Sequence, residues 1–558
     1  MNKITMNKGK RVIYILCFAC MMLIDWSRGG PKWVYWATCI NLVGVVMSIV
    51  MACAFIWKDQ FRKGGPWKRY VVWLALWLLG STVGYLLWKQ QPGRIFQTQY
   101  LTAALSVLCL GMVALRIWTS RRDLRDRGAT FGNPILIGIW GVMTVLMVCS
   151  PIDEIWQLYY LVIFGMFYVI PYEKAEREVL WISVADGVIL GFFLIQIWAY
   201  GFRPYDVVRY AGAYGNCNIN ALFYLVTYIC VLYRLHDMWN RKEQGRVGNH
   251  RLFTAAQVLF YLLAAGLCGF MLMTITRTAL LVGGLVTVVF GVLELCVYHR
   301  LKVHKVLLHL AMYGVCVVLL FPCVYATVRY LPTILHHPVW WDGEYAPWKV
   351  HSYDAADSEK YVSFEELLEE VFLRLAGITV DIHFEKEEVV SDATMPVQNV
   401  LTIMPMENLE ELFTVKMLAT ALPDTGLLQG KEADSSMGIR QFIWKTYLSN
   451  LNFTGHELEE GYFQVTPYYQ SWHAQNVLIQ VLFYYGIPAG ILFAVLMAVL
   501  GIQALRAAVR NRDTESLLLL LVWTVFMGYG MLECVWYMGQ SILFLMYLAP
   551  KVLIDRRK

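Results

Sequence analysis

The segment YYQSWHAQNVLIQVLFYYGIPAG, residues 468–490, turns from polar and aromatic to apolar within a few positions. Its apolar part continues to about residue 505, and roughly 20 apolar residues suffice for a helix to cross a bilayer. His473 stands shortly before this predicted span. The preceding segment SSMGIRQFIWKTYLSN, residues 435–450, carries Arg440 and Trp444. The pattern predicts a membrane helix whose entrance holds a fixed cation and a titratable imidazole.

The whole chain is apolar for its length. It has 558 residues, of which 58% are hydrophobic and 16% charged, and its mean hydropathy is +0.50. Soluble domains carry about 25% charged residues. Backbone groups inside lipid must be hydrogen-bonded within the chain, so the apolar runs are expected to be helices. The sequence therefore predicts an all-α polytopic membrane protein with about 14 transmembrane helices.

The predicted spans lie near residues 12–25, 34–57, 71–88, 101–119, 134–150, 156–171, 180–200, 219–234, 252–275, 279–297, 306–328, 476–505, 515–532 and 536–554. The first of them follows a cluster of basic residues, and no small-residue cleavage pattern comes after it. We therefore expect it to be a span and not a cleaved signal peptide.

Charge is distributed unevenly along the chain, whose formal net charge is +6. Residues 331–475 contain 23 Asp and Glu against 8 Lys and Arg, so this segment carries −15 and the remainder carries +21. Most of the basic residues lie in alternate short loops, and basic loops stay in the cytoplasm. We expect both termini in the cytoplasm and the acidic segment outside it. This distribution does not indicate a nucleic-acid partner.

The topology divides the chain into three parts. Residues 1–330 are predicted to hold transmembrane helices 1–11, residues 331–475 an extracytoplasmic loop or cap, and residues 476–558 helices 12–14 with a cytoplasmic tail. Within the loop, Ser363-Phe-Glu-Glu366 has the spacing of a helix-capping box. Glu407–Ala421 is a second helix candidate and Ile378–Val390 a candidate strand. The cap is therefore expected to be partly helical.

Cysteine usage indicates no disulfide framework in the cap. The chain has 13 Cys, and none lies in residues 331–475. Cys17 and Cys20 form a CxxC inside an apolar span, where small buried side chains are a better interpretation than a redox or metal site.

Three constellations place polar groups at predicted membrane entrances. The first, RYAGAYGNCNINA at residues 209–221, contains Arg209, Asn216 and Asn218. Glycine permits close backbone approach and Asn offers hydrogen bonds, although a capped helix start would use the same residues. The second is Thr276-Arg277-Thr278 at a very short turn between two spans. Arg277 would pair with an acid, bind an anion or extend its charge into water.

The third constellation joins the two segments quoted at the start. Arg440 and Trp444 are four positions apart and share one helical face. His473 follows in the same outer region, and a packed imidazole at the interface is the alternative to a catalytic one. Asp186 in a predicted span is either a proton relay or the buried partner of an Arg.

In this order, the constellations resemble the O-antigen ligase and O-antigen polymerase superfamily of bacterial membrane glycosyltransferases. The resemblance covers roughly residues 200–550 and ends with Asn476 and the sequence Gly486-Ile-Pro-Ala-Gly490 after the outer loop. The usual adjacent His-Asn pair is split here as His473-Ala-Gln-Asn476, so His456 stays an alternative to His473.

The resemblance implies a fold, a location and a reaction. It implies a GT-C-like protein of the bacterial cytoplasmic membrane that transfers a glycan from an undecaprenyl-diphosphate carrier to a glycan, lipid or wall-polymer acceptor. No metal, nucleotide sugar or other cofactor is implied. We expect Arg209, Arg277 and Arg440 to bind the diphosphate and His473 to act as general base, with inversion at the anomeric carbon. The supporting residues are Asn216, Asn218, Trp444 and Asn476.

Other functions compete with this interpretation. A transporter or flippase of lipid-linked glycans would use similar apolar helices, although the chain shows no repeated halves. A membrane scaffold or sensor would use the outer loop for binding alone. The sequence does not distinguish a polymerase from a ligase, and it does not specify the sugar, its linkage, the acceptor or the oligomeric state.

Overall fold

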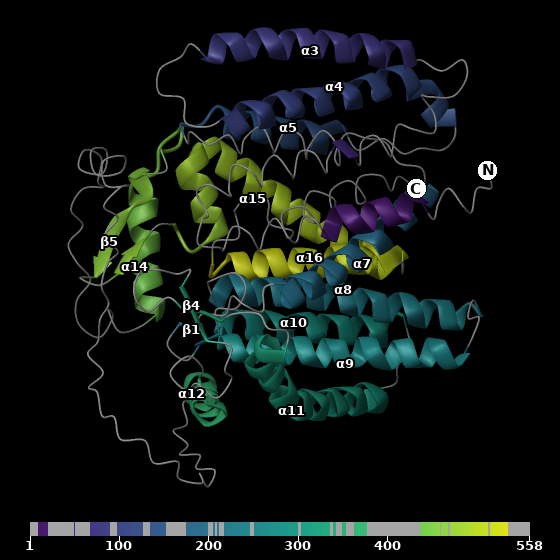
Figure 1. Ribbon diagram of the computed structural model, residues 1–558, viewed down its shortest axis with the longest axis vertical. Helices are drawn as coiled ribbons and strands as arrows, with labels where there is room; N and C mark the ends of the chain where they lie inside the picture. Colours follow the sequence, from purple (N-terminus) through teal and green to yellow (C-terminus); the bar gives the residue numbers. More distant parts are fainter. Residues whose placement is uncertain are drawn as a thin grey trace.

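The computed structural model describes residues 9–19, 49–50, 67–89, 97–126, 134–151, 174–198, 205–206, 209–210, 217–245, 250–298, 303–334, 339–341, 349–352, 362–376, 436–457, 459–466, 469–471, 473–511 and 514–533. These residues are mostly helical, and the long helices run roughly side by side (Figure 1). The helices are α3 Trp67–Lys89, α4 Gln97–Asp126, α5 Pro134–Val148, α7 Lys174–Trp198, α8 Cys217–Glu243, α9 His250–Thr274, α10 Arg277–Val292, α11 Val303–Ile334, α12 Phe364–Ala376, α14 Ser436–Ser449, α15 Val477–Asn511 and α16 Thr514–Gly530.

Short elements complete the described part of the chain. A π-helix, η4 Leu293–Val297, continues α10, and a 3₁₀-helix spans Glu459–Gly461. Strands pair only as two-stranded antiparallel hairpins in this part of the structure. The hairpins join β1 Tyr205–Asp206 to β2 Arg209–Tyr210, β3 Val339–Trp341 to β4 Lys349–Ser352, and β5 Phe463–Thr466 to β6 Tyr469–Ser471.

The prediction of a helical membrane protein is confirmed. Six helical stretches of the described residues are long and apolar enough to cross a bilayer: Trp67–Leu87, Cys217–Glu243, His250–Thr274, Arg277–Val297, Leu307–Leu331 and Val477–Arg510. Four shorter apolar helices, in α4, α5, α7 and α16, coincide with further predicted spans. The spans predicted at 156–171 and 536–554 lie outside the described residues, as does the span at 34–57 apart from residues 49–50. The helix candidate at 407–421 and the strand candidate at 378–390 also lie outside them.

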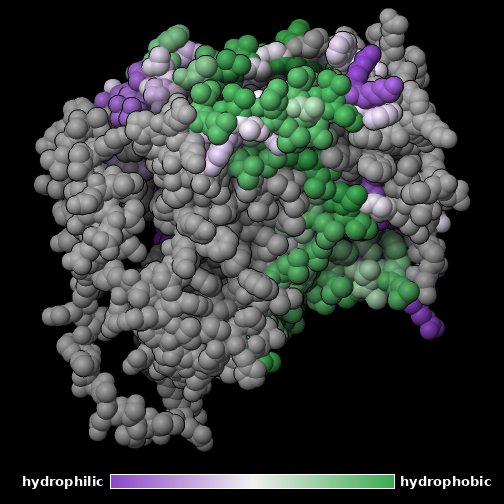
Figure 2. Space-filling view, turned by 45° about the horizontal axis from the view of Figure 1, so that its top comes forward, coloured by the Kyte–Doolittle hydropathy of each residue, from purple (hydrophilic) through white to green (hydrophobic). Residues whose placement is uncertain are grey.

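Helix α8 forms the centre of the bundle. It packs on α7, α9, α10 and α16, and most of its side chains are buried. Apolar side chains around its whole circumference fit a helix enclosed on every side. By contrast, α3 packs on α4 and leaves a row of leucines exposed. Figure 2 shows a broad hydrophobic surface on the face that includes α3 and α4, as expected for contact with lipid.

Asp186 is the partner of two arginines. Its carboxylate lies 2.7 Å from Arg11 and 2.9 Å from Arg234, which also contacts Asp237 at 2.8 Å. Buried charges are stable when they are paired in this way. Of the two interpretations of Asp186, the structure supports the ion pair. Cys17 is a buried side chain on the helix formed by residues 9–19, and Cys20 lies outside the described residues.

The described elements of the predicted cap lie at one end of the bundle (Figure 1). Helix α12 packs on α9, and α14 packs on α15 and β5. The predicted capping box is present, because Glu366 N donates to Ser363 Oγ (3.2 Å) and Ser363 N donates to Glu366 Oε2 (2.9 Å). Helix α8 begins at this end, α9 and α16 finish there, and α10 and α15 begin there.

Helix α15 is interrupted at Gly486, whose φ of 85° and ψ of 161° are open to glycine alone. The N–H of Ile487, freed by the break, donates to the carbonyl of Asn452 (3.1 Å). The backbone of residues 453–455 passes close to Gly486. A Cβ on Gly486 would lie 2.3 Å from the carbonyl oxygen of Phe453 and 3.0 Å from the backbone nitrogen of Gly455. The interruption therefore anchors the segment between α14 and β5 onto the start of α15.

Replacing Gly486 with Ala should destabilise the protein. The backbone conformation alone costs about 1–3 kcal/mol in a residue with a Cβ, and the clash adds to it. We expect a lower apparent Tm in thermal unfolding of the detergent-solubilised protein. Gly284→Ala on α10 is the matched control, since no atom lies within 4 Å of the added carbon. Equal melting of Gly486→Ala and wild type would contradict this account.

Candidate functional site

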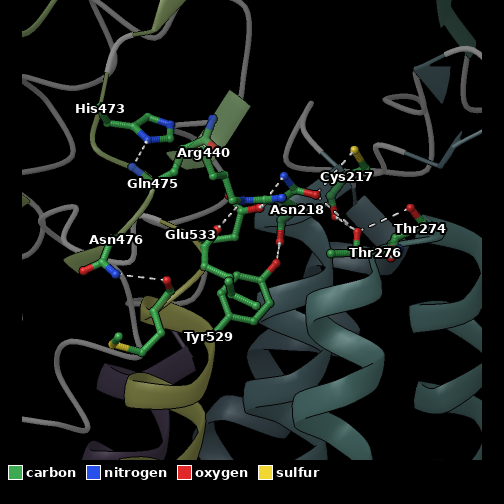
Figure 3. Close-up of polar contacts among 12 residues, drawn as sticks. Cys217, Asn218, Thr274, Thr276, Arg440, His473, Gln475, Asn476, Tyr529 and Glu533 are labelled. Carbon is green, nitrogen blue, oxygen red and sulfur yellow. Dashed lines mark hydrogen bonds and ion pairs between the residues drawn. The ribbon is translucent and has the colours of Figure 1, made fainter. Parts of the chain in front are cut away.

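A cluster of polar side chains lies where the helix ends meet beneath the cap elements (Figure 3). We define the polar cluster as Arg209, Asn218, Thr276, Arg440, His473 and Glu533. Its members come from β2, the first turn of α8, the turn between α9 and α10, α14, the segment before α15 and the residues after α16. Residues hundreds of positions apart are thereby in hydrogen-bonding distance.

Arg209 is held by the turn between α9 and α10. Its Nε donates to the carbonyl of Thr274 (3.2 Å), and its Nη2 donates to Thr276 Oγ1 (3.2 Å) and Asn218 Oδ1 (2.8 Å). Between these threonines, Ile275 has a φ of 49° and is 2% exposed. A left-handed conformation is unfavourable for a buried β-branched residue, so surrounding packing must impose it. The strain makes the turn tight and brings the acceptors to Arg209.

Arg440 is held by the end of α16. Its Nε donates to the carbonyl of Leu532 (3.0 Å), and its Nη2 donates to Glu533 Oε1 (2.7 Å). The Arg440 side chain is 18% exposed and that of Glu533 is 10% exposed. The same Oε1 accepts from Asn218 Nδ2 (3.1 Å). A continuous chain of hydrogen bonds therefore runs from Arg209 through Asn218 and Glu533 to Arg440.

Asn218 has a fixed orientation in this chain. Its amide nitrogen faces Glu533 and its amide oxygen faces Arg209, while the hydroxyl of Tyr529 donates to its backbone carbonyl (2.6 Å). An acceptor on one side and a donor on the other leave only one favourable amide orientation. The predicted supporting residue Asn218 thus links the two guanidinium groups.

His473 lies beside Arg440 in Figure 3 and is partly buried. Burial, followed by the positive charge of Arg440, lowers the pKa of His473 to about 4, so the ring is neutral at pH 7. The backbone N–H of Gln475 donates to His473 Nδ1 (3.2 Å), with Gln475 in a left-handed conformation at φ 48°. A neutral ring that accepts at Nδ1 carries its proton on Nε2. The imidazole therefore presents a donor at Nε2.

Glu533 is the residue that the sequence analysis missed. It follows a predicted span, and an acid at a helix end is usually solvated, so its residue type alone did not single it out. Burial raises the pKa of Glu533, and Arg440, Arg209 and the hydrogen bond from Asn218 oppose this shift. An acid within one turn of a predicted span, on the same side of the membrane as the arginines, was the signal available in the sequence.

Asn476 has a structural role at this site. Its side-chain oxygen accepts from the N–H groups of Leu478 (3.0 Å) and Ile479 (3.2 Å), which caps the start of α15. Its amide nitrogen donates to the carbonyl of Met531 (3.0 Å). It thereby fixes the start of α15 to the chain that carries Glu533.

The other predicted residues lie around the cluster or outside the described chain. Arg277 begins α10 next to Thr276, but its side chain is exposed and makes no hydrogen bond or ion pair with another described residue. Trp444 lies one turn along α14 from Arg440, is partly buried and packs against the hydrophobic core. Asn216 lies outside the described residues.

His456, the alternative base, is committed to structural contacts. Its Nδ1 lies 2.6 Å from Glu460 Oε2 and its Nε2 lies 2.6 Å from the carbonyl of Asn450. The ring also stacks on Phe483, with centroids 4.0 Å apart. Both ring nitrogens are occupied, so the geometry favours His473 as the imidazole of the site.

Comparison of the sequence with known protein families finds no matching family model, and comparison with curated proteins finds no match. The resemblance to the O-antigen ligase and polymerase superfamily stays a prediction. Within the part of the chain that the structure describes, no group of three or more His, Cys, Asp or Glu is arranged to hold a metal ion.

Stability should depend on pH through His473. Its pKa lies at about 4 in the folded protein and near 6.5 in the unfolded chain, so between these values the unfolded state binds more protons. Stability should therefore fall as pH drops from 6.5 towards 4, by at most about 3 kcal/mol. His473→Gln should flatten this part of the profile in thermal unfolding. The same slope in variant and wild type would contradict the assigned pKa.

Proposed function

We propose that this protein is a membrane glycosyltransferase that moves a glycan from an undecaprenyl-diphosphate carrier to a hydroxyl group of an acceptor. The observation that carries the proposal is the convergence of Arg209 and Arg440 on the Asn218–Glu533 pair, with a neutral His473 beside them. Guanidinium groups are the side chains best suited to phosphate oxygens, and here hydrogen bonds within the protein hold both of them in place.

Formal charge supports a diphosphate as the ligand. The combined formal charge of Arg209, Arg440 and Glu533 is +1, and Arg277, next to Thr276 of the cluster, raises it to +2. A diphosphate esterified at both ends carries about two negative charges at neutral pH. The exposed side chain of Arg277 makes no hydrogen bond or ion pair with a described residue, so its guanidinium is a candidate contact for the ligand. Charge complementarity of this kind favours the ligand in a site of low dielectric constant.

The same groups would lower the barrier of the reaction. Breaking the bond between the anomeric carbon and the diphosphate leaves negative charge on the leaving group, and fixed cations next to that charge stabilise the transition state. The acceptor attacks from the opposite face and inverts the anomeric centre. The acceptor hydroxyl also loses a proton in this reaction, and the sequence analysis predicts His473 as the group that removes it. Apolar helix surfaces such as those of α3 suit contact with lipid.

Basic residues at the opposite end of the bundle support an extracytoplasmic site. They lie at the end of α8, the start of α9 and the end of α15: Arg241, Lys242, Arg251, Arg506 and Arg510. Under the positive-inside rule this end faces the cytoplasm. The proposal thus includes a bacterial inner-membrane location, cytoplasmic termini, about 14 spans and a cap formed by residues 331–475 in a GT-C-like arrangement.

The acceptor class is left open within this proposal. A polymerase would extend a glycan on its carrier, and a ligase would deliver it to a lipid, protein or wall polymer. The rival function, transport of lipid-linked glycans, is distinguished by turnover of the purified protein in a single compartment. A transporter would move the lipid without releasing undecaprenyl diphosphate.

Arg440→Lys should reduce glycan transfer roughly 100-fold or more, because Lys keeps the charge but loses the planar fork. The assay uses protein in lipid nanodiscs, lipid-linked glycans extracted from the native host, and release of undecaprenyl diphosphate as the measurement. Arg241→Lys is the matched control at the opposite end, where Arg241 contacts Asp237 (3.0 Å). Unchanged turnover in Arg440→Lys, or equal loss in the control, would argue against the proposed site.

Arg277→Lys tests whether the exposed arginine binds the ligand. If its fork contacts the diphosphate, the variant should bind inorganic diphosphate at least tenfold more weakly and transfer glycan more slowly. If Arg277 only extends its charge into water, Lys should replace it without loss. Isothermal titration with inorganic diphosphate separates the two cases, with Arg241→Lys again as the control.

A further inference from the structure

Glu533 has one anchored carboxylate oxygen and one that is not engaged. Oε1 accepts from both Arg440 and Asn218. Oε2 makes no hydrogen bond with any described residue, and it is not among the fully enclosed side-chain atoms that lack a partner. Glu533 as a whole is only 7% exposed, and its Oε2 is an acceptor atom without a donor among the described residues. Such an oxygen suits a hydroxyl group brought by a ligand.

The neutral imidazole of His473 cannot take a proton at Nε2, because that nitrogen already carries a hydrogen. Nδ1 accepts from the N–H of Gln475, so the neutral ring carries its hydrogen on Nε2. Gln475 is held in a left-handed conformation, which fixes that donor against the ring. In this state Nε2 is a hydrogen-bond donor and not a proton acceptor.

We propose that Glu533 is the general base of the transfer and that His473 is a hydrogen-bond donor to the anionic ligand. The assignment rests on the glycan transfer proposed above and names the proton acceptor within that site. The acceptor hydroxyl gives its proton to Oε2 of Glu533. The oxygen's electron pair forms the new bond to the anomeric carbon, and the bond from that carbon to the diphosphate breaks with its electron pair on the leaving oxygen.

The position of Arg440 fits this division of roles. Arg440 contacts Glu533 through Nη2 and the carbonyl of Leu532 through Nε. A guanidinium group can bind a carboxylate and a phosphate oxygen through different nitrogens, an arrangement that would hold the base and the leaving group apart. Inverting transfer needs such a separation, because the sugar lies between the base with its acceptor and the leaving group. Burial also raises the pKa of Glu533, which makes it a stronger base than an exposed carboxylate.

The experiment compares two nucleophiles in the nanodisc assay with lipid-linked glycans from the native host. A hydroxyl acceptor must lose a proton, whereas azide ion has none to lose. Glu533→Gln should lower transfer to the native hydroxyl acceptor by roughly 10²–10⁴-fold and should still form the inverted glycosyl azide. His473→Gln and Arg440→Lys should lose both reactions together, because they weaken stabilisation of the leaving group.

Three results would overturn the assignment. A folded Glu533→Gln that makes no glycosyl azide would show that Glu533 only positions Arg440. Azide rescue of His473→Gln instead would make the imidazole the base. Undiminished hydroxyl transfer by Glu533→Gln would exclude the carboxylate. Wild-type protein that releases no undecaprenyl diphosphate with either nucleophile would refute the proposed function itself, which is a separate failure.

Folding of the variant is controlled independently. Removing the charge of Glu533 leaves the guanidinium of Arg440 without its counter-ion, so size-exclusion chromatography accompanies each assay. Glu533→Asp keeps the charge and withdraws the carboxylate by one methylene group. It should show the same selectivity for azide with a smaller loss of hydroxyl transfer, and equal loss with both nucleophiles would count against the base.

Discussion

The contact between Arg440 and Glu533 joins helix α14 to the end of the helix bundle. In the chain, α14 comes before the β5–β6 hairpin and α15, whereas Glu533 lies just after α16. Asn218 extends the link to α8, and through Asn218 it reaches Arg209. Breaking a buried pair by removing one partner typically costs about 3–5 kcal/mol, since the other charge is left without compensation. The site and the packing of its supporting helices therefore depend on the same carboxylate.

Backbone strain is concentrated at this site. Among the described residues, only Ile275 and Gln475 have positive φ without being glycine. Ile275 shapes the turn that holds Arg209, and Gln475 directs its N–H to His473. Strained residues of this kind persist only where surrounding packing imposes them, and they are common where a protein arranges groups for function. The turn at Ile275 contacts the enclosed helix α8, because Thr276 Oγ1 lies 3.4 Å from the backbone carbonyl of Cys217.

Local patterns explain what could be predicted. The apolar run predicted at 252–275 is α9, His250–Thr274, and the capping box at Ser363 begins α12. Both are set by neighbouring residues, which sequence displays directly. The role of Glu533 depends on a residue 93 positions away, Arg440, and no local pattern reports that contact. The same reason left His456 and His473 as alternatives, because only their surroundings show which ring is committed to structure.

The sequence by itself determined that this is a helical membrane protein and that Arg209, Arg277, Arg440 and His473 stand at span entrances, because hydropathy and charge act along short stretches of chain. Only the tertiary structure decided that Arg209 and Arg440 share one hydrogen-bonded chain, that Arg277 stays outside it, and that Glu533 is part of the site. Those facts follow from how distant helix ends pack together. Burial and the orientation of a single N–H group, which also arise from packing, set the protonation of His473.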